Sequence, residues 1–383
     1  FLSNMTGWVE RRNFKYCVDF GAGAMEHFFT RYPKLKARMA VAAQAGTIEF
    51  VNGTYAQPYP LLYSNESMLR QFEIGKAEVK SLFGVEVKSY ASQEFGFTPA
   101  LPALLNLSGY DANVGRVYNQ GDVPRTDQKL ISWRGKDGET IPTLPAHSYA
   151  SEKEYDFTYA NLHIKLLEAA KHAPDTVVST SLGDASYYRP FREELARVQY
   201  YAPVFGELCT FADYFKRFKP ENTYNIKADD LRFDGYFLNL DNWESMHARH
   251  AGGANRHGCL VQQAEFSLLA LERADAVLFA LTGKTPEPAD WKPLLQYEGH
   301  DNYVVPYETV GEFMRDQGNL IHYCGPANQI SLRERSENEL LISIETVEKA
   351  LDERLETLCN LFSGGPDTYI AFNPAPTRKI LAE

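Results

Sequence analysis

The chain has 383 residues, a formal net charge of −11 and 13% aromatic residues in an otherwise ordinary globular composition. Its length allows two or three domains with a sizeable core. The negative charge argues against nucleic acid and acidic membranes as partners. There is no apolar run of about 18 residues that would predict a membrane-spanning segment.

The N-terminal part of the chain alternates strand and helix patterns. Residues 14–20 alternate apolar and polar side chains, and 47–51 form a short apolar run, so both are predicted strands. Helical spacing covers 21–32 between them, and Pro33 starts a second helix that ends at Gly46.

A third helix is predicted over 64–83, with Ser64 or Asn65 as its N-cap, and a strand over 84–90 follows it. Strands that alternate with helices indicate an α/β fold built on a parallel sheet or barrel.

The segment 90–102 leads from the end of that strand to a short helix, 103–109, that ends at a glycine. It places an amide, Gln93, beside a carboxylate, Glu94, at a strand-to-helix turn, where polar side chains face a cavity in many active sites. An active-site loop and an ordinary surface loop both fit this pattern.

Further strands are predicted over 112–118 and, as a hairpin with an Asp-Gly turn, over 130–134 and 140–144. A helix over 157–173 precedes a strand, 175–180, that runs directly into Asp184. Asp184 and Gln93 therefore both follow strand ends, which favours a shared site on one rim of the sheet. The alternative for Asp184 is the N-cap of a following helix.

The C-terminal part of the chain has helical periodicity only. Helices are predicted around residue 264, over 306–319 and from residue 340 onward, and together they indicate a helical bundle. The residues expected to form its core are Ala264, Leu268, Leu271, Ala274, Leu278, Leu340, Ile344, Val347, Leu351, Leu355, Leu358 and Phe362.

The five cysteines are widely spaced and include no CxxC pair, which predicts free, buried thiols rather than disulfides or a cysteine zinc site. The chain starts without Met and ends just after a strand-like run, 368–372. We therefore expect it to be a segment of a longer protein, and its compartment is not predicted.

Several segments, in order along the chain, resemble the glycoside hydrolase family 38 α-mannosidases. They are Gly46–Gly53, Tyr90–Pro102, Trp133–Gly138, His250–Gly252, Trp291–Asp301 and Ala371–Pro374. The resemblance implies a seven-stranded β/α barrel-like domain, a three-helix bundle and large β domains. On that basis we expect residues 1–245 to form the barrel-like domain without its first strand, 246–362 the bundle, and 363–383 the start of a C-terminal β-sandwich domain.

The resemblance also implies retaining chemistry, in which an aspartate attacks the sugar and a second carboxyl group, about 5 Å away, protonates the leaving oxygen. The acid/base position falls on Asp184 and the nucleophile position on Gln93. A neutral amide does not form a normal glycosyl ester, so Gln93 departs from the family. Glu94 is adjacent, but it replaces the nucleophile only if the loop bends, because neighbouring side chains of an extended segment point to opposite sides.

Two further positions match the family's substrate pocket. Arg116 matches an arginine near the nucleophile, where it would bind a carboxylate or a sugar hydroxyl; otherwise it is a solvated strand end. Tyr149 matches a pocket tyrosine. Both residues are therefore candidate substrate-binding residues.

The family holds a zinc ion through an opening His-x-Asp motif, the nucleophilic aspartate and a histidine of the bundle. The resemblance assigns this histidine to His300 and the following substrate-binding aspartate to Asp301. Zinc is therefore an expected cofactor. The opening motif is absent from the chain, and His300 is the one matched histidine. His247, His250 and His257 form a second histidine cluster, to which the resemblance gives a structural or pocket-edge role.

The sequence thus predicts a glycosidase that acts on a carbohydrate substrate. Two alternatives stay open: a catalytically inactive carbohydrate-binding relative, and a metal-independent glycosidase or lyase on the same scaffold.

Overall fold

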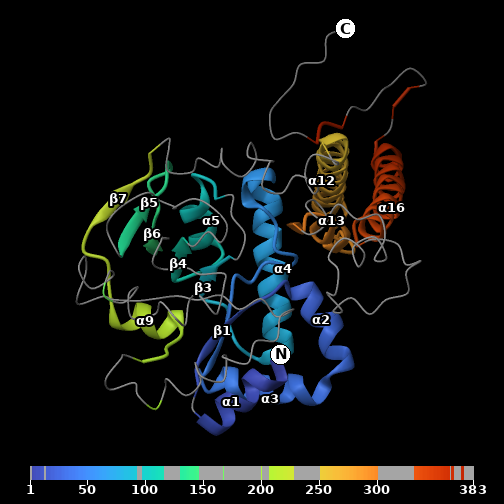
Figure 1. Ribbon diagram of the computed structural model, residues 1–383. Helices are drawn as coiled ribbons and strands as arrows, with labels where there is room; N and C mark the ends of the chain where they lie inside the picture. The colour runs from blue at the N-terminus through green and yellow to red at the C-terminus, as the bar shows by residue number, and fades with distance from the viewer. Residues whose placement is uncertain are drawn as a thin grey trace. The chain divides into compact units, whose positions relative to one another are not determined.

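The computed structural model describes residues 2–12, 14–92, 97–115, 130–145, 167, 200, 207–227, 251–300, 332–362, 364–365 and 372–374. The chain divides into two compact units, 1–243 and 244–383, which are described separately (Figure 1). The first unit confirms the predicted α/β class, with a mixed sheet. Closure of a barrel, the three-helix bundle and the predicted domain boundaries stay predictions.

The first unit contains six α-helices among its described residues: α1 (Leu2–Arg12), α2 (Ala22–Arg31), α3 (Pro33–Gln44), α4 (Asn65–Phe83), α5 (Leu101–Leu107) and α9 (Phe211–Arg217), with a short 3-10 turn, η1 (Pro60–Leu62). Helices α2 to α4 agree with the prediction. The Ser64 hydroxyl caps α4 by accepting a hydrogen bond from the Ser67 N–H at 3.0 Å. Helix α1 was not predicted, although Met5 and Trp8 have helical spacing and pack with Phe14 in a small core.

The described part of the first unit contains a two-stranded and a five-stranded sheet. Strands β1 (Tyr16–Asp19) and β2 (Ile48–Val51) are parallel. The five-stranded sheet runs β3 (Ser89–Ala91), β4 (Ala112–Gly115), β6 (Thr140–Pro145), β5 (Ile131–Arg134) and β7 (Thr223–Asn225). Strands β3, β4 and β6 are parallel to one another, whereas β5 and β6 form the predicted antiparallel hairpin. The chain after β2 also meets β3, because the Asn52 N–H donates to the Ser89 carbonyl at 3.2 Å.

Strand β3 is shorter than the predicted strand over 84–90. Gly84 ends α4 with a left-handed φ of 72° and donates its N–H to the Lys80 carbonyl at 2.8 Å. Val87 is fully buried, but ladder pairing with β4 begins only at Ser89. The alternating pattern therefore reflects which side chains are buried, and it extends beyond the hydrogen-bonded strand.

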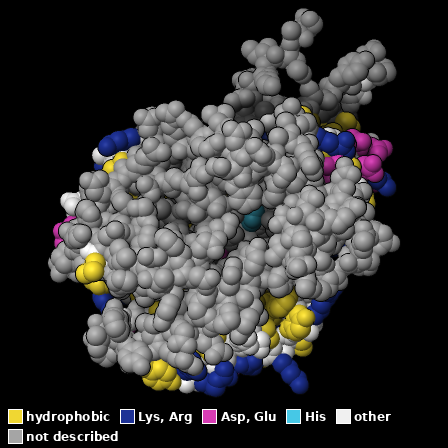
Figure 2. All heavy atoms as spheres, in the orientation of Figure 1, with side chains coloured by type: hydrophobic (Ala, Val, Ile, Leu, Met, Phe, Trp, Pro, Cys, Tyr) yellow, Lys and Arg dark blue, Asp and Glu magenta, His cyan; other side chains and the backbone are white. Residues whose placement is uncertain are grey.

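The two-stranded sheet has a different core on each face. On one face Phe50 of β2 stacks on Phe83 of α4, with ring centroids 4.1 Å apart. On the other face Val51 belongs to a cluster with Tyr214 and Phe215 of α9. Figure 1 accordingly shows α2 and α4 on one side of β1 and α9 on the other. In Figure 2, Lys, Arg and hydrophobic side chains are visible at the lower margin, over α1 to α3.

The second unit contains α12 (Ala251–Thr282), α13 (Lys292–Tyr297) and α16 (Leu332–Leu361). Helices α12 and α16 pack through Ala274, Leu278 and Leu358, which confirms these predicted core positions. Phe362, also predicted to be buried, is 53% exposed because it follows the last turn of α16. The predicted helices over 157–173 and 306–319 lie outside the described residues, apart from Leu167, which is helical.

The four described cysteines are free thiols, as predicted, but Cys259 and Cys359 are exposed rather than buried. Both lie on long helices, away from the packed faces. None of the helices in the described part of the chain combines the length and the apolar character needed to cross a bilayer.

Candidate active site

Three described strands end at one edge of the five-stranded sheet, and each is followed in the sequence by a predicted site residue. Because β3, β4 and β6 are parallel, their carboxyl ends meet at the same edge. Gln93 is two residues beyond the end of β3, Arg116 immediately follows β4, and Tyr149 is four residues beyond β6. In α/β folds this edge carries the ligand-binding loops.

The carboxyl end of β1 carries a carboxylate in a defined setting. The Asp19 Oδ1 atom accepts hydrogen bonds from Asn52 Nδ2 at 3.0 Å and from Gln57 Nε2 at 2.8 Å. Asp19 and Gln57 are half-buried, whereas Asn52 is only 1% exposed. We call these three residues the Asp19 cradle.

The loop that supplies both amides has an unusual backbone. Among the described residues, Asn52 and Gln57 are the non-glycine residues with positive φ, at 69° and 51°. The left-handed region costs about 1–2 kcal/mol for an ordinary L-residue and less for Asn. Thr54 joins the two residues, because its hydroxyl donates to Asn52 Oδ1 and accepts from the Gln57 N–H, both at 3.1 Å. Side-chain hydrogen bonds therefore hold the loop in its strained conformation.

Helix α4 and Tyr110 also hold this loop in place through hydrogen bonds. The Tyr110 hydroxyl donates to the Asn52 carbonyl at 2.5 Å, and the Ala56 N–H donates to Gln71 Oε1 of α4 at 3.0 Å. A Cβ atom at Gly75 would overlap the Gly53 carbonyl, so α4 approaches the loop closely only because this residue has no side chain.

A second polar group, Ser92, lies at the end of β3 beside Tyr90. Both residues are 1% exposed, and they directly precede the Gln93–Glu94 segment. Burial raises the pKa of the Tyr90 hydroxyl well above its usual range; the Ser92 hydrogen bond acts to lower it, and the negative charge of Asp19 adds to the increase. Tyr90 therefore stays a neutral hydroxyl near the Asp19 carboxylate.

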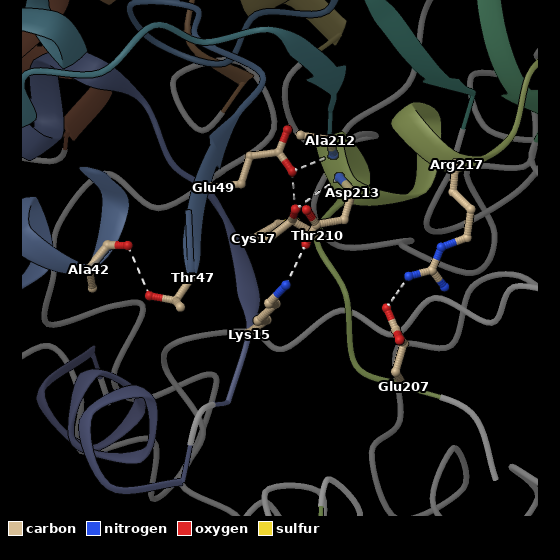
Figure 3. Close-up of polar contacts among 10 residues, drawn as sticks. All are labelled: Lys15, Cys17, Ala42, Thr47, Glu49, Glu207, Thr210, Ala212, Asp213 and Arg217. Carbon is tan, nitrogen blue, oxygen red and sulfur yellow. Dashed lines mark hydrogen bonds and ion pairs between the residues drawn. The ribbon is translucent and has the colours of Figure 1, made fainter. Parts of the chain in front are cut away.

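Glu49 is a buried carboxylate with a different environment (Figure 3). It lies on β2, and its Oε2 atom accepts hydrogen bonds from the Ala212 N–H at 2.9 Å and from the Cys17 thiol at 3.6 Å. Burial raises the pKa of Glu49, although hydrogen bonds from Ser89, Ala212 and neighbouring groups act in the opposite direction. Because Glu49 binds the first turn of α9, we assign it to the structural link between β2 and α9.

Most of the predicted site residues lie outside the described residues. Gln93, Glu94, Arg116, Tyr149, Asp184 and Asp301 are all in this group, so their predicted roles stay predictions. His300 is described: it follows α13 in the second unit and is 8% exposed. His257 is also buried, and its ring stacks on Tyr297 with centroids 4.5 Å apart, in agreement with a structural role.

The described residues do not assemble a metal site. No group of three His, Cys, Asp or Glu side chains in this part of the chain is arranged to hold a metal ion. Of the residues that the resemblance relates to zinc, His300 alone is described. The other predicted ligand position, Gln93, lies outside the described residues, so the zinc site stays a prediction.

Sequence reasoning missed the Asp19 cradle. Asp19 lies near the end of the predicted strand 14–20, and Asn52 directly follows the predicted strand 47–51, so each part of the cradle was close to a predicted strand end. The Asp19 contacts with Asn52 and Gln57 join residues 33 and 38 positions apart, and that pairing depends on how β1 and β2 align.

Residues 2–238, more than half of the chain, match the glycosyl hydrolases family 38 N-terminal domain. The chain belongs to glycosyl hydrolase family 38. This confirms the family resemblance on which the predicted site residues depend. The match ends shortly before the second compact unit begins.

Two relatives of this family 38 chain are named as α-mannosidases. An α-mannosidase of Saccharomyces cerevisiae is 26% identical over 108 residues, which is 27% of this chain and 10% of the relative. The α-mannosidase G of Dictyostelium discoideum is 25% identical over 126 residues, 32% of this chain and 12% of the relative. The chain thus matches only about a tenth of the length of these relatives.

A crystal structure of an α-mannosidase from Enterococcus faecalis has the same fold. The superposition gives a TM-score of 0.62 at 17% sequence identity and covers 94% of this chain but 40% of the other. At this identity the likeness concerns the fold alone.

Proposed function

We propose that this family 38 chain is the catalytic part of a glycoside hydrolase that resembles the retaining α-mannosidases. Family membership and the parallel order of β3, β4 and β6 support the proposal together. The parallel order supports it because the three strands end at one edge. In the sequence, β3 is followed by Gln93, β4 by Arg116 and β6 by the segment with Tyr149. Carbohydrate is the proposed substrate class.

In the proposed reaction Asp184 donates its proton to the glycosidic oxygen as the bond from that oxygen to the anomeric carbon breaks. A carboxylate attacks the anomeric carbon from the opposite face and forms a glycosyl ester. Water then attacks the ester, Asp184 takes the proton from the water, and the carboxylate leaves. Asp184 must hold a proton near neutral pH, which requires a raised pKa.

Gln93 holds the family's nucleophile position and provides no carboxylate. We propose that Glu94 supplies it, through a bend of the loop that starts after Ser92. Arg116 would then bind the Glu94 carboxylate or a sugar hydroxyl, and Tyr149 and Asp301 would contact the substrate.

Two other functions fit the same family and fold. If the site has decayed at Gln93, the protein binds carbohydrate without hydrolysing it. If the chemistry does not use metal, the protein is a metal-independent glycosidase or a lyase on this scaffold. The zinc ion that the resemblance implies would use His300, and we assign no step of the reaction to it.

Aryl glycosides of several sugars, incubated with the full-length protein, test the proposal. We expect hydrolysis of an α-mannoside with retention of the anomeric configuration. No turnover of any glycoside, with or without added zinc, would overturn the enzymatic function.

Gln93→Asp separates the alternatives. Hydrolysis that appears only in this variant supports a decayed site, whereas turnover that is present in the wild type and lost in Glu94→Gln supports Glu94 as the nucleophile. Turnover that a chelator leaves unchanged, in a protein that contains no metal after purification, supports metal-independent chemistry. Asp111→Asn, at an exposed aspartate of the first unit, is the matched control.

A further inference from the structure

The Asp19 cradle lies at the carboxyl end of β1, is held rigidly and is partly exposed. A carboxylate with a purely structural role does not need all three properties. Asp19 is the last residue of β1, its register partner is Val51, and the loop with both amide donors starts at the next residue, Asn52. The cradle therefore belongs to the carboxyl end of a parallel pair of strands, where α/β proteins place ligand-binding groups.

The cradle is held rigidly. Two amide donors on the same Asp19 oxygen fix the orientation of the carboxylate, and Thr54 fixes the two amide-bearing residues relative to each other. Both amide-bearing residues have left-handed backbones, a feature that gathers at ligand-binding positions, where the surrounding structure maintains it.

The members of the cradle differ in exposure. Asn52 and Thr54 are each 1% exposed, whereas Asp19 and Gln57 are half-buried, and the Oδ2 atom of Asp19 is itself buried. A rigid carboxylate next to an amide presents hydrogen-bond acceptors and donors to a neutral ligand that has several hydroxyl groups.

The cradle is also linked to the loop with the proposed nucleophile. The Asn52 N–H binds the first residue of β3, Ser89, at 3.2 Å, and β3 leads through Ser92 to Gln93 and Glu94.

We propose that Asp19, oriented by Asn52 and Gln57, is a substrate-binding residue that accepts hydrogen bonds from sugar hydroxyl groups and contributes to sugar specificity. The proposal rests on the glycosidase function proposed above. Asn52 is a positioning residue, since its buried amide acts through Asp19.

Asp19→Asn tests this role, because the asparagine oxygen still accepts from Asn52 and Gln57 while the charge is lost. We expect KM for an aryl α-mannoside to rise roughly 10-fold with a smaller change in kcat, as for the loss of a charged hydrogen bond. The preference for the mannoside over its deoxy analogues should fall by the same factor. For an analogue that lacks the contacted hydroxyl group, KM should be the same for Asp19→Asn as for the wild type.

Gln57→Gly is the second variant, because glycine accepts the left-handed backbone at this position without strain. It should raise KM in the same direction even if Asp19→Asn fails to fold. Asp111→Asn serves as the control and should leave KM unchanged.

Saturation-transfer NMR with methyl α-mannoside gives a second readout that does not need turnover. Binding that is present in the wild type and weakened in both variants supports the cradle, even if no hydrolysis is found and the catalytic proposal fails. Wild-type turnover with unchanged KM, specificity and NMR signal in both variants would overturn the cradle alone. A wild type that neither binds nor hydrolyses the mannoside would overturn both proposals.

Discussion

The Glu49 carboxylate on β2 accepts a 2.9 Å hydrogen bond from the backbone N–H of Ala212, 163 positions later in the chain. Ala212 lies in the first turn of α9, where N–H groups have no partner within the helix. Glu49 thus connects the N-terminal strand pair to a helix that packs against the sheet.

Glu49→Gln should change how stability depends on pH. The pKa of Glu49 is raised by burial, so the folded protein keeps this proton at pH values where the unfolded chain, with a pKa near 4.5, has lost it. The stability contributed by the group is therefore fully present below that value and is lost as pH rises through the folded pKa. The free energy of unfolding of the variant, relative to the wild type, should increase as the pH rises above about 4.5 and through the raised pKa of the folded protein.

Urea unfolding at a series of pH values measures this difference. Glu10→Gln is the control, because the Arg38 hydrogen bond lowers the pKa of Glu10 and its contribution is lost on acidification instead. A Glu49→Gln curve parallel to the wild type would contradict the assignment.

Gly75→Ala should destabilise the first unit. Alanine in a helix interior is normally favoured over glycine by about 0.5–1 kcal/mol. At Gly75 a Cβ atom would lie 2.5 Å from the Thr54 carbonyl carbon and 2.6 Å from the Tyr55 nitrogen. We expect a loss of about 2 kcal/mol, because backbone atoms of the cradle loop would have to shift.

Gly258→Ala in α12 is the matched change, since a Cβ atom there meets nothing within 4 Å. It should be neutral or stabilising in thermal unfolding. Equal effects of the two substitutions would show that close packing between α4 and the cradle loop is not what restricts Gly75.

Asp184→Asn should reduce turnover by roughly 10²–10⁴-fold if Asp184 is the general acid, since the amide does not donate a proton to the leaving oxygen. Aryl glycosides with more acidic leaving groups should lose less, because they need less help from the acid. A loss of equal size for all leaving groups, or a loss of folding seen by circular dichroism, would instead support the N-cap alternative.

Arg354→Met should destabilise the second unit by about 3 kcal/mol. Arg354 Nε donates to Asp275 Oδ1 at 2.8 Å, and the Asp275 side chain is 6% exposed, so the substitution leaves a buried carboxylate without its cation. Asp275→Asn combined with Arg354→Met should recover much of the loss. The exposed pair Arg38–Glu10 is the comparison, and Arg38→Met should change stability by less than about 1 kcal/mol.

The sequence by itself determined the local elements of this protein. Strand alternation, Pro33 at the start of α3 and the Ser64 cap of α4 depend on neighbouring residues, so they could be predicted in place. Family membership was also predictable, because ordered segments such as Tyr90–Pro102 keep their spacing along the chain.

The tertiary structure decided which polar groups meet. Asp19 joins Asn52 and Gln57 only because β1 and β2 pair in one register, and Glu49 meets Ala212 only because α9 packs back on the sheet. Neither contact has a signal in local periodicity, since hydrogen bonds between distant residues depend on how the elements pack. Gln93 and Asp184 were predicted from family positions, whereas the Asp19 cradle became visible only in the folded chain.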